Sequence, residues 1–424
     1  MIPKRILFVI RSYSPDQVGG GAKSVQTLAE GLAARGHDVH VLRLAPRGEE
    51  SDYLKRAEEA GVAGPGKPQL HIAPLRNIHW PFGKEEHTKA SKLLWHAIDM
   101  HNPWAALDVR RLLREIKPDI VNTSIIDGFS PSIWREIQRS GAKLIHTMRD
   151  YYLICARSSM YRNGRNCDSL CGSCKVIRTI NRRRLRQADL LLANSGFVAD
   201  THKRFAGLPA DLRTAVQWNV NERPIVTDIR SLWSESIVFG YIGRLAPTKG
   251  VDILLDAVTQ MPADGRNWSL LIAGDGPSAY VEKLKASAEA LPNVKFLGWT
   301  APEEFYAQID VLVCPSVYNE PLPRVIYEAY GFAIPVIASR VGGHPEIVTD
   351  GDSGRLYKGD DSRCLAECMQ TFRNMPHHGY QEYSAGALLH GQKFTPAAVL
   401  DSFEDHMAAL FARPEDVPEG GRRK

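Results

Sequence analysis

The stretch Asp310-Val-Leu-Val-Cys-Pro-Ser-Val-Tyr-Asn-Glu-Pro-Leu-Pro-Arg-Val-Ile-Tyr-Glu-Ala-Tyr-Gly-Phe-Ala-Ile-Pro-Val-Ile-Ala338 places an amphipathic segment between two apolar runs. The runs Asp310–Cys314 and Pro335–Ala338 have the length of strands, and the segment after Pro323 has the spacing of a helix. Strands joined through a helix are parallel, because a long crossover is needed to start the next strand at the same edge. The stretch therefore predicts an α/β fold in which helices cover a parallel sheet.

The same alternation extends over most of the chain. In the first half it predicts helices at Ser24–Arg35 and Ala105–Ile116, and strands at Arg5–Ile10, Val39–Leu42, Ile120–Thr123, Lys143–Thr147 and Leu190–Asn194. In the second half it predicts helices at Val251–Met261 and Tyr280–Ala290, and strands at Ser236–Ile242, Ser269–Ala273 and Val294–Leu297. The segment Ala45–Asn102 has little clear period. We interpret it as an elaborated loop region that selects the substrate.

The length of 424 residues exceeds what one hydrophobic core usually supports, so we expect two domains. Each half has the pattern of a doubly wound, Rossmann-like domain, and the two are expected to face a central cleft at the carboxyl ends of their strands. The predicted parts are an N-terminal domain at 1–218, a linker at 219–235, a C-terminal domain at 236–394, a helix at 395–413 that packs back on the first domain, and a disordered tail at 414–424.

The composition is that of an ordinary globular protein, with 44% hydrophobic and 24% charged residues. The net charge of +5 is modest for this length and gives no reason to expect a nucleic acid partner. The apolar runs are too short to span a membrane, and the first residues show no signal-peptide pattern. We therefore expect a cytoplasmic protein whose cysteines are reduced.

Two glutamates, Glu320 and Glu328, lie on either side of the start of the helix that follows Pro323. Both carboxylates can face one ligand at the helix N-terminus, where free backbone N–H groups and the helix dipole favour an anion. A sugar nucleotide matches this arrangement, because its hydroxyls suit carboxylates and its diphosphate suits the helix end.

A glycine cluster, Gly19, Gly20 and Gly21, follows the first strand and opens the next helix. Glycines at such a place let the backbone approach a ligand closely. A nucleoside triphosphate P-loop is excluded, because Ala22 and Gln17 occupy the positions at which that motif requires glycine. A merely flexible loop remains the alternative.

In the second half, Arg244 and Lys249 lie in the loop between a strand and the next helix. Two cations at the carboxyl end of a strand are well placed to hold a diphosphate and stabilise it as it leaves. Solvated surface charges are the alternative for both residues. The later motifs are Ala273-Gly-Asp-Gly-Pro, which turn chemistry alone explains, and Val341-Gly-Gly-His-Pro-Glu, whose glycines suggest a close backbone approach.

These motifs, in this order, resemble the retaining glycosyltransferases of family 4, which have the GT-B fold. The resemblance is tight over Ser236–Val348 and looser over the N-terminal half. It implies an N-terminal acceptor domain and a C-terminal domain that binds a nucleotide-sugar donor, with Arg244 and Lys249 on the diphosphate. It also implies that Glu320 contacts the donor sugar and Glu328 the ribose, that Gly19 to Gly21 close over the donor, and that catalysis requires no metal or other cofactor.

The chain departs from the family pattern at two places. Pro323 stands where many relatives have glycine, and proline cannot donate a backbone N–H, so Leu322 and Arg324 would supply that contact. Arg149 and Asp150 occupy the positions of the family's frequent His-Asp pair. In a retaining front-face displacement the leaving phosphate can take the acceptor proton, so Arg149 is expected to hold a donor hydroxyl or an acceptor phosphate.

A cysteine cluster, comprising Cys155, Cys167, Cys171 and Cys174, follows the strand Lys143–Thr147. In a reducing compartment such clustering suggests a metal site rather than disulfides, and thiolates with this spacing suit structural zinc. An iron–sulfur cluster and free thiols remain alternatives.

A basic helix is predicted directly after the cysteine cluster. Its cations are Lys175, Arg178, Arg182, Arg183, Arg184 and Arg186. The span Arg178–Arg186 suits anionic lipid headgroups and would bring the protein to a lipid-linked acceptor at the inner face of the membrane. A solvated helix face is the alternative.

Together these features predict an enzyme that moves a hexose-type sugar, with retention, from a nucleotide-diphosphate donor to a glycan or lipid-linked acceptor in cell-surface polysaccharide synthesis. Two classes of alternative remain. A nucleotide-sugar epimerase or a sugar phosphorylase shares the architecture, although the sequence gives no distinct sign of a pyridoxal phosphate lysine. A non-catalytic sugar-nucleotide-binding protein is the other.

Overall fold

The computed structural model describes residues 2–15, 19–64, 66–81, 87–208, 211–230, 236–262 and 267–412. The chain forms two compact units. The first comprises Met1–Ser159, Asp168–Val220 and Pro396–Lys424, and the second comprises Met160–Cys167 and Asn221–Thr395. The predicted tail at 414–424 and part of the predicted linker, 231–235, lie outside the described residues.

The first unit contains a seven-stranded parallel sheet in the order β3-β2-β1-β4-β5-β8-β9. Its strands are β1 (Arg5–Ile10), β2 (Asp38–Ala45), β3 (Gln69–Pro74), β4 (Ile120–Ser124), β5 (Lys143–Met148), β8 (Leu190–Ala193) and β9 (Thr214–Val216). Burial on both faces explains why strands such as β1 and β8 are almost continuously apolar. The strand order reverses between β1 and β4, so their carboxyl ends form the switch point at which such sheets bind ligands.

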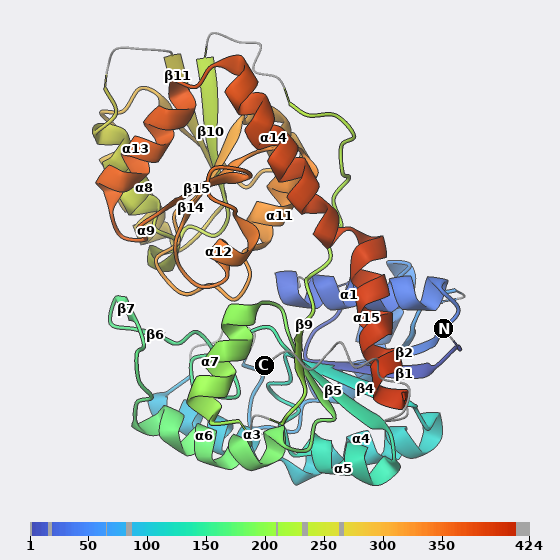
Figure 1. The fold of residues 1–424 in the computed structure, drawn as a ribbon. Coiled ribbons are helices and arrows are strands. Elements are labelled where there is room, and N and C mark those ends of the chain that lie inside the picture. Colours follow the sequence, from blue (N-terminus) through green and yellow to red (C-terminus); the bar gives the residue numbers. More distant parts are fainter. Residues whose placement is uncertain are drawn as a thin grey trace. The chain divides into compact units, whose positions relative to one another are not determined.

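Helices cover both faces of this sheet, with α1 and α15 on one face and α4 and α5 on the other (Figure 1). The helices of this unit are α1 (Gly20–Ala34), α2 (Glu50–Glu59), α3 (Lys89–Met100), α4 (Pro103–Ile116), α5 (Ile133–Ser140), α6 (Gly172–Leu185), α7 (Gly196–Ala206) and α15 (Pro396–Phe411). The C-terminal helix α15 contributes Phe403 and Met407 to the core of the first unit, where they pack with Phe8 of β1 and Leu28 of α1.

The second unit contains a six-stranded parallel sheet in the order β12-β11-β10-β13-β14-β15. Its strands are β10 (Ser236–Ile242), β11 (Asn267–Ala273), β12 (Val294–Gly298), β13 (Val311–Cys314), β14 (Val336–Ser339) and β15 (Gly354–Tyr357). A small antiparallel hairpin, β6 (Tyr161–Arg162) and β7 (Arg165–Asn166), also belongs to this unit. The order of the sheet reverses between β10 and β13.

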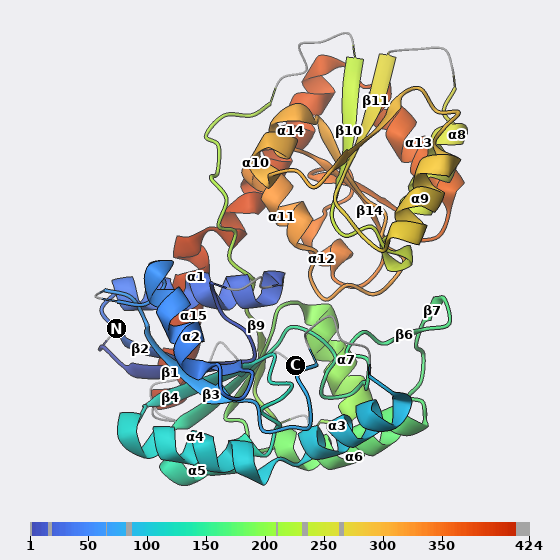
Figure 2. The same ribbon diagram turned by 180° about the vertical axis from the view of Figure 1, so that it is seen from behind.

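Helices cover this second sheet in the same way, with α8, α9 and α13 on one face and α10, α11 and α14 on the other (Figure 2). The helices are α8 (Val251–Thr259), α9 (Ser278–Ser287), α10 (Pro302–Gln308), α11 (Arg324–Gly331), α12 (His344–Ile347), α13 (Ser362–Arg373) and α14 (His377–Gly391), and the single 3-10 turns are Pro247–Lys249 and Gln392–Phe394. The prediction of two Rossmann-like α/β domains is confirmed.

The interpretation of Ala45–Asn102 as an elaborated loop is wrong. This segment contains α2, the edge strand β3 and α3. The strand β3 was missed because an edge strand has fewer neighbours to cover it, so its burial and its apolar pattern are weaker than those of central strands; only Ala73 of its six residues is fully buried. The helix α3 was missed because it leaves two leucines exposed, which disturbs its amphipathic pattern.

Candidate functional site

The candidate donor site of the second unit lies at the carboxyl ends of the neighbouring strands β10 and β13. The loop after β10 carries Arg244 and Lys249, and the loop after β13 carries Glu320. The backbone N–H of Val317 donates to the carbonyl of Thr248 at 3.0 Å, which joins the two loops. The topology therefore brings together residues that lie about seventy positions apart in the sequence.

Lys249 and Glu320 form the central ion pair of this site. Lys249 Nζ lies 2.7 Å from Glu320 Oε1, and the Ser316 hydroxyl donates to the same carboxylate oxygen. Burial opposes ionisation of Glu320, but Lys249 outweighs it and lowers the pKa of the carboxyl group. Burial likewise opposes the charge of Lys249, and Glu320 raises the pKa of the ammonium group. The pair is therefore charged at neutral pH.

Two glycines allow the loops to approach Glu320. Gly250 has φ +67°, and a Cβ atom there would lie 2.0 Å from the Pro315 carbonyl oxygen. Gly342 has φ +54°, and a Cβ atom there would lie 2.2 Å from the Glu320 carbonyl oxygen. No side chain fits at these distances, so only glycine permits this packing. The close backbone approach expected at Val341-Gly-Gly is therefore an approach of Gly342 to the backbone of Glu320.

The second glutamate, Glu328, lies in the first turns of α11 and is buried. Its Oε1 accepts a hydrogen bond from Arg324 Nε at 2.6 Å, and its Oε2 accepts one from the Tyr306 hydroxyl at 3.1 Å. Arg223 Nε lies 3.5 Å from Glu328 Oε1. Within the second unit the Glu328 carboxylate therefore has two arginines and a tyrosine hydroxyl as partners. A ligand hydroxyl that hydrogen-bonds to Glu328 would join these partners or replace one of them.

The helix α11 begins directly after Pro323, as predicted. Pro323 is the N-cap residue, Arg324 is the first helical residue, and no side chain caps the helix. Leu322 is buried. Arg324 reaches Glu328 at 2.6 Å and Glu222 at 3.4 Å, so its side chain is engaged in ion pairs at the helix start.

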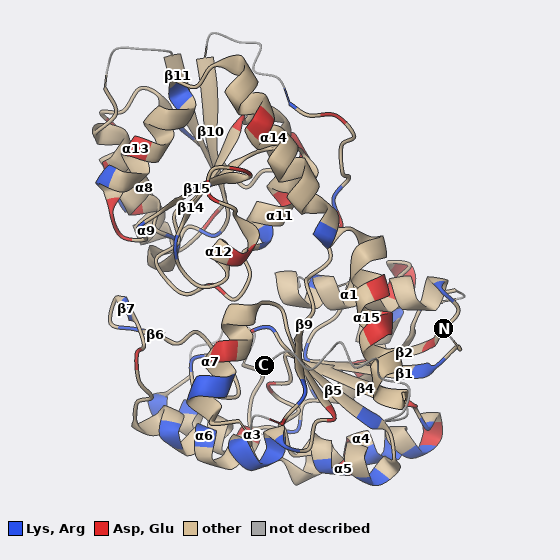
Figure 3. Cartoon of the chain, in the orientation of Figure 1, with Lys and Arg blue, Asp and Glu red and all other residues tan. Residues whose placement is uncertain are grey.

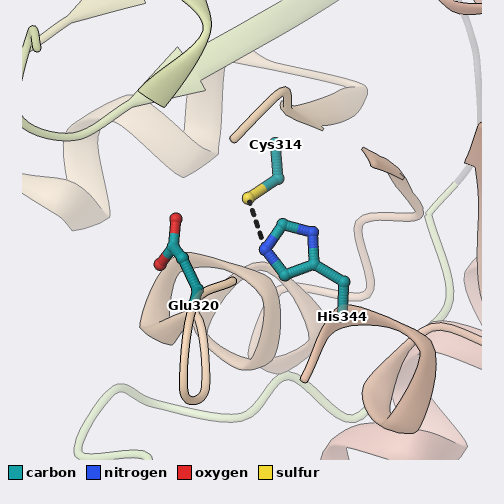
Figure 4. Close-up of side chains that lie close together, drawn as sticks. All are labelled: Cys314, Glu320 and His344. Atoms are coloured by element: carbon teal, nitrogen blue, oxygen red, sulfur yellow. Dashed lines mark hydrogen bonds between the residues drawn. The ribbon is translucent and has the colours of Figure 1, made fainter. Parts of the chain in front are cut away.

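A cluster of three potential metal ligands, Cys314, Glu320 and His344, lies at the same place (Figure 4). Cys314 Sγ is 3.9 Å from His344 Nε2, and His344 Nδ1 donates to the Ser339 carbonyl at 2.9 Å. Burial lowers the pKa of His344 to about 4, so the ring is neutral at pH 7. The cluster does not fit a metal ion, because the Lys249 ammonium already lies against Glu320 and would repel a second cation.

The β6–β7 hairpin holds the loop that carries Glu320. Asn166 Nδ2 donates to the Val317 carbonyl at 3.0 Å, and Asn166 Oδ1 accepts from the Asn319 N–H at 2.8 Å. Asn319 Oδ1 in turn accepts from the Gly342 N–H at 3.2 Å. Sequence reasoning missed this element, although its two-residue Asn163-Gly164 turn, with φ of 52° and 75°, is a strong hairpin signal.

In the first unit the glycine cluster opens α1 beside the carboxyl end of β4. Gly19 is the N-cap residue, and Gly20 and Gly21 are the first helical residues. No side chain caps this helix, so its first backbone N–H groups point out of the helix N-terminus without a side-chain acceptor. A Cβ atom on Gly21 would lie 2.8 Å from Ile125 Cδ1, so a larger residue there would have to displace the end of that side chain.

Arg149 and Asp150 follow β5 in the same unit. Arg149 is buried and donates hydrogen bonds to Asn219 Oδ1 and, at 3.4 Å, to the Ser24 hydroxyl of α1. Asp150 Oδ1 accepts from the Tyr152 N–H at 2.9 Å. Burial raises the pKa of Asp150 to about 6. Arg149 therefore links the end of the sheet to α1 and to Asn219.

The cysteine cluster is divided between the units: Cys155, Cys171 and Cys174 belong to the first, and Cys167 to the second. Cys171 Sγ and Cys174 Sγ are 3.4 Å apart. Zinc bonds of about 2.3 Å place sulfur atoms roughly 3.8 Å apart, so this pair has a suitable spacing. Among the described residues, however, these cysteines form no group of three converging ligand atoms of the kind found at Cys314.

Comparison with known proteins identifies the family. Residues 18–216 match the model of glycosyltransferase family 4, and residues 236–374 match that of glycosyl transferases group 1. The chain belongs to the glycosyltransferases that these two models describe. Its fold is the GT-B fold of the solved glycosyltransferase structures. The family resemblance inferred from the order of the motifs is confirmed.

Relatives of this glycosyltransferase include an uncharacterized 42.6 kDa protein in the cps region of Klebsiella pneumoniae. That protein is 29% identical over 81% of this chain and 87% of its own length. The D-inositol 3-phosphate glycosyltransferase of Corynebacterium diphtheriae is 26% identical over 95% of this chain and 94% of its own.

Solved structures share the fold of this glycosyltransferase. Sucrose-phosphate synthase from Thermosynechococcus elongatus has a TM-score of 0.70 at 19% identity and covers 96% of this chain and 99% of its own. Anabaena HepE, in complex with UDP, has a TM-score of 0.65 at 20% identity and covers 96% of this chain and all of its own. In the described part of this chain, no helix combines the length and apolar character needed to cross a membrane.

Proposed function

We propose that this glycosyltransferase moves a sugar, with retention of configuration, from a nucleotide-diphosphate donor to a glycan or lipid-linked acceptor of a cell-surface polysaccharide. The observation that carries the proposal is the Lys249–Glu320 ion pair at the switch point of the second sheet, with the exposed Arg244 in the same loop. A cation and a carboxylate at this place match the two halves of a sugar diphosphate.

Each residue of the site has a distinct role in the proposed reaction. Because Glu320 is ionised and already accepts from Lys249 and Ser316, it serves as an acceptor for donor-sugar hydroxyls rather than as an acid. Lys249 and Arg244 stabilise the diphosphate as the bond between the sugar and the phosphate oxygen breaks. The acceptor oxygen forms the new bond to the sugar, and its proton passes to the leaving phosphate. Glu328 binds the ribose hydroxyls.

The donor and acceptor classes are supported by the relatives. The Anabaena structures contain UDP and UDP-glucose, which supports a nucleotide-sugar donor here. The Klebsiella relative is encoded in a cps region, which supports a polysaccharide acceptor. We propose that the enzyme acts in the cytoplasm, at the inner face of the membrane when its acceptor is lipid-linked.

We further propose that catalysis needs no metal, because Lys249 and Arg244 supply the positive charge that a metal would otherwise bring. Structural zinc on the cysteine cluster is a separate proposal, supported by the close Cys171 and Cys174 sulfurs. Elemental analysis of the purified protein tests for the structural zinc. Activity after dialysis against a chelator tests whether catalysis needs a metal. Absence of zinc from active protein overturns the zinc site, and loss of activity that Mg²⁺ restores overturns metal-free transfer.

The decisive experiment compares Glu320→Ala and Glu328→Ala with Glu367→Ala, an exposed glutamate of α13 in the same unit. A thermal-shift screen of nucleotide sugars first identifies the donor. Glu320→Ala should mainly lower kcat, Glu328→Ala should mainly raise the KM for the donor, and Glu367→Ala should change neither. NMR of the product should show the anomeric configuration of the donor. Wild-type kinetics for either site variant, or an inverted product, contradicts the proposal.

The same assay separates the alternatives. An epimerase converts the donor without an acceptor, a phosphorylase requires phosphate and pyridoxal phosphate, and a non-catalytic protein binds the donor but transfers nothing. Transfer that depends on the added acceptor excludes all three.

A further inference from the structure

Three helices of the first unit leave large apolar side chains exposed. The exposed fractions are 73% for Leu93 and 52% for Leu94 on α3, 59% for Trp104 and 58% for Leu107 on α4, and 53% for Val176 on α6. These five are a large share of the twelve exposed large apolar side chains of the described chain. Single exposed apolar residues need no explanation, but five on three neighbouring helices of one unit call for one.

The three helices are neighbours within the first unit. Arg184 of α6 donates hydrogen bonds to the carbonyl of Met100, the last residue of α3, and, at 3.1 Å, to the ring of His101. His101 immediately precedes the α4 segment that carries Trp104 and Leu107. Both views show α3, α4 and α6 along the same side of this unit (Figures 1 and 2). We call their exposed surface the docking face.

The docking face is strongly basic. Together α3, α4 and α6 contain ten Lys and Arg and three Asp and Glu, a net charge of +7, whereas the whole chain carries +5. The remainder of the protein is therefore slightly acidic, and the positive charge is concentrated here (Figure 3). Of the three acidic residues only Glu115 is exposed, since Asp99 is buried and Asp108 pairs with Arg76 at 2.7 Å.

We propose that the docking face binds the surface of an anionic lipid bilayer. The exposed cations of these helices, which include Lys92, Arg182 and Arg183, would lie among the phosphate headgroups. The leucines and Trp104 would enter the boundary between headgroups and acyl chains, where an indole with one polar edge is well accommodated. This inference extends the basic helix of the sequence analysis to α3 and α4, and it does not depend on sugar transfer.

The combination of side chains favours a bilayer over other anionic partners. A nucleic acid would use the cations, but it offers no apolar layer for four exposed aliphatic side chains, and its bases are bound by stacking on aromatic rings. A lipid bilayer satisfies the charges and the apolar residues at once. Binding should therefore need both the cations and the exposed apolar side chains, and salt should weaken the electrostatic contribution.

The test is co-sedimentation of the full-length protein with vesicles of phosphatidylglycerol and phosphatidylcholine, compared with vesicles of phosphatidylcholine alone. We expect binding to the anionic vesicles at least tenfold stronger than to the neutral ones, with a large loss between low and high salt. The fluorescence of Trp104, obtained as the difference between the wild type and Trp104→Phe, should shift to shorter wavelength on binding.

Two sets of variants separate the charged from the apolar contribution. Arg182→Glu with Arg183→Glu should weaken binding at least tenfold, and Leu93→Ser with Leu94→Ser and Trp104→Ser should leave only weak, fully salt-sensitive binding. Matched controls in the second unit are Arg363→Glu, Leu389→Ser and Trp299→Ser, which are also exposed and should have no effect. All these positions are on the surface, so circular dichroism should confirm intact folding.

Three outcomes would overturn the proposal. They are equal binding to neutral and anionic vesicles, the same loss of binding for the control variants, and displacement of the protein from vesicles by a stoichiometric amount of duplex DNA. Activity on a water-soluble acceptor should stay unchanged in the docking-face variants. A failure of vesicle binding with intact transfer would therefore count against the docking face alone, and a failure of transfer with intact vesicle binding would count against the proposed function alone.

Discussion

Asn166 and Asn319 are joined by a 2.8 Å hydrogen bond from the Asn319 N–H to the Asn166 side-chain oxygen. The Asn166 amide nitrogen donates to Val317 at 3.0 Å, so one side chain spans both sides of Tyr318. The Asn166 side-chain amide thus pairs with the loop backbone as a peptide group of a neighbouring strand would. It orders the loop directly before Glu320, whose carboxylate is the center of the candidate donor site.

Replacing Asn166 by alanine should lower kcat by up to about thirtyfold, because the loss of two hydrogen bonds worth roughly 1 kcal/mol each releases the Glu320 loop. Asn166→Asp keeps the acceptor for Asn319 but loses the donor to Val317, so its kcat should be intermediate. Arg162→Ala in the same hairpin serves as the control. The readouts are kcat and the donor KM, measured separately. An unchanged kcat for Asn166→Ala would show that the hairpin does not position Glu320.

Replacing Lys249 by methionine should destabilise the second unit by about 3–5 kcal/mol, because it leaves the buried Glu320 carboxylate without its cation. The double variant Lys249→Met with Glu320→Gln should recover much of that loss, since neither charge is then buried. Denaturant unfolding of the two variants and of the wild type measures the difference. Equal destabilisation in the single and double variants would contradict a stabilising ion pair.

The same ion pair should make stability depend on pH in the acid range. The folded-state pKa of Glu320 is lowered, so its contribution is fully present above the unfolded-state value near 4.5 and is lost as the pH falls through the folded-state pKa. Melting temperatures measured from pH 6 to pH 3 should fall less steeply for Glu320→Gln than for the wild type. If the melting temperatures of the two proteins fell in parallel, protonation of the Glu320 carboxyl group would have no effect on stability, contrary to this prediction.

His344 should contribute a second pH dependence at a higher pH. Its folded-state pKa is about 4, below the usual 6.5. Between these two pH values His344 binds a proton in the unfolded chain but not in the folded chain. Stability should therefore fall by up to about 3 kcal/mol as the pH decreases from 6.5 to 4. His344→Gln should reduce this slope, and His378→Gln, at an exposed position on α14, should leave it unchanged.

Asp99 should act in the opposite direction in the first unit. Burial raises its pKa to about 7, although it accepts hydrogen bonds from the Tyr152 hydroxyl at 2.6 Å and the Gly128 N–H at 2.7 Å. Ionisation therefore costs stability as the pH rises from 4 towards 7. Asp99→Asn should be more stable than the wild type at pH 8 by about 1–3 kcal/mol and should lose this advantage at pH 5. The comparison of melting temperatures at the two pH values tests this, and an advantage independent of pH would contradict it.

Most of the secondary structure could be predicted because the central strands are buried on both faces. Strands such as β1 and β13 are nearly continuous apolar runs, and the glycines and prolines between them mark the turns. Elements with a weaker pattern were missed. The edge strand β3 is mostly half-buried, and the hairpin β6–β7 is too short to show a period, although its Asn-Gly turn was visible.

The candidate site could be predicted only in part. The glutamates, the basic pair and the glycine cluster were identified from their positions after strands, which the order of elements alone suggests. The roles of His344, Tyr306 and Asn166 could not be predicted, because each contacts the site from a different part of the chain. Ser316 was missed although it lies in the same loop as Glu320. Arg149 is a further case, since its partners Ser24 and Asn219 lie far from it in the sequence.

By itself, the sequence determined the alternation of strands and helices, the division into two Rossmann-like halves and the family, because these depend on local periodicity and on the order of short motifs. Only the tertiary structure decided which side chains meet. It paired Lys249 with Glu320, placed Asn166 against the loop before that glutamate, and brought Arg184 of α6 against the last residue of α3. The physical reason is that contacts between distant segments depend on strand order and helix packing, which no local pattern of residues encodes.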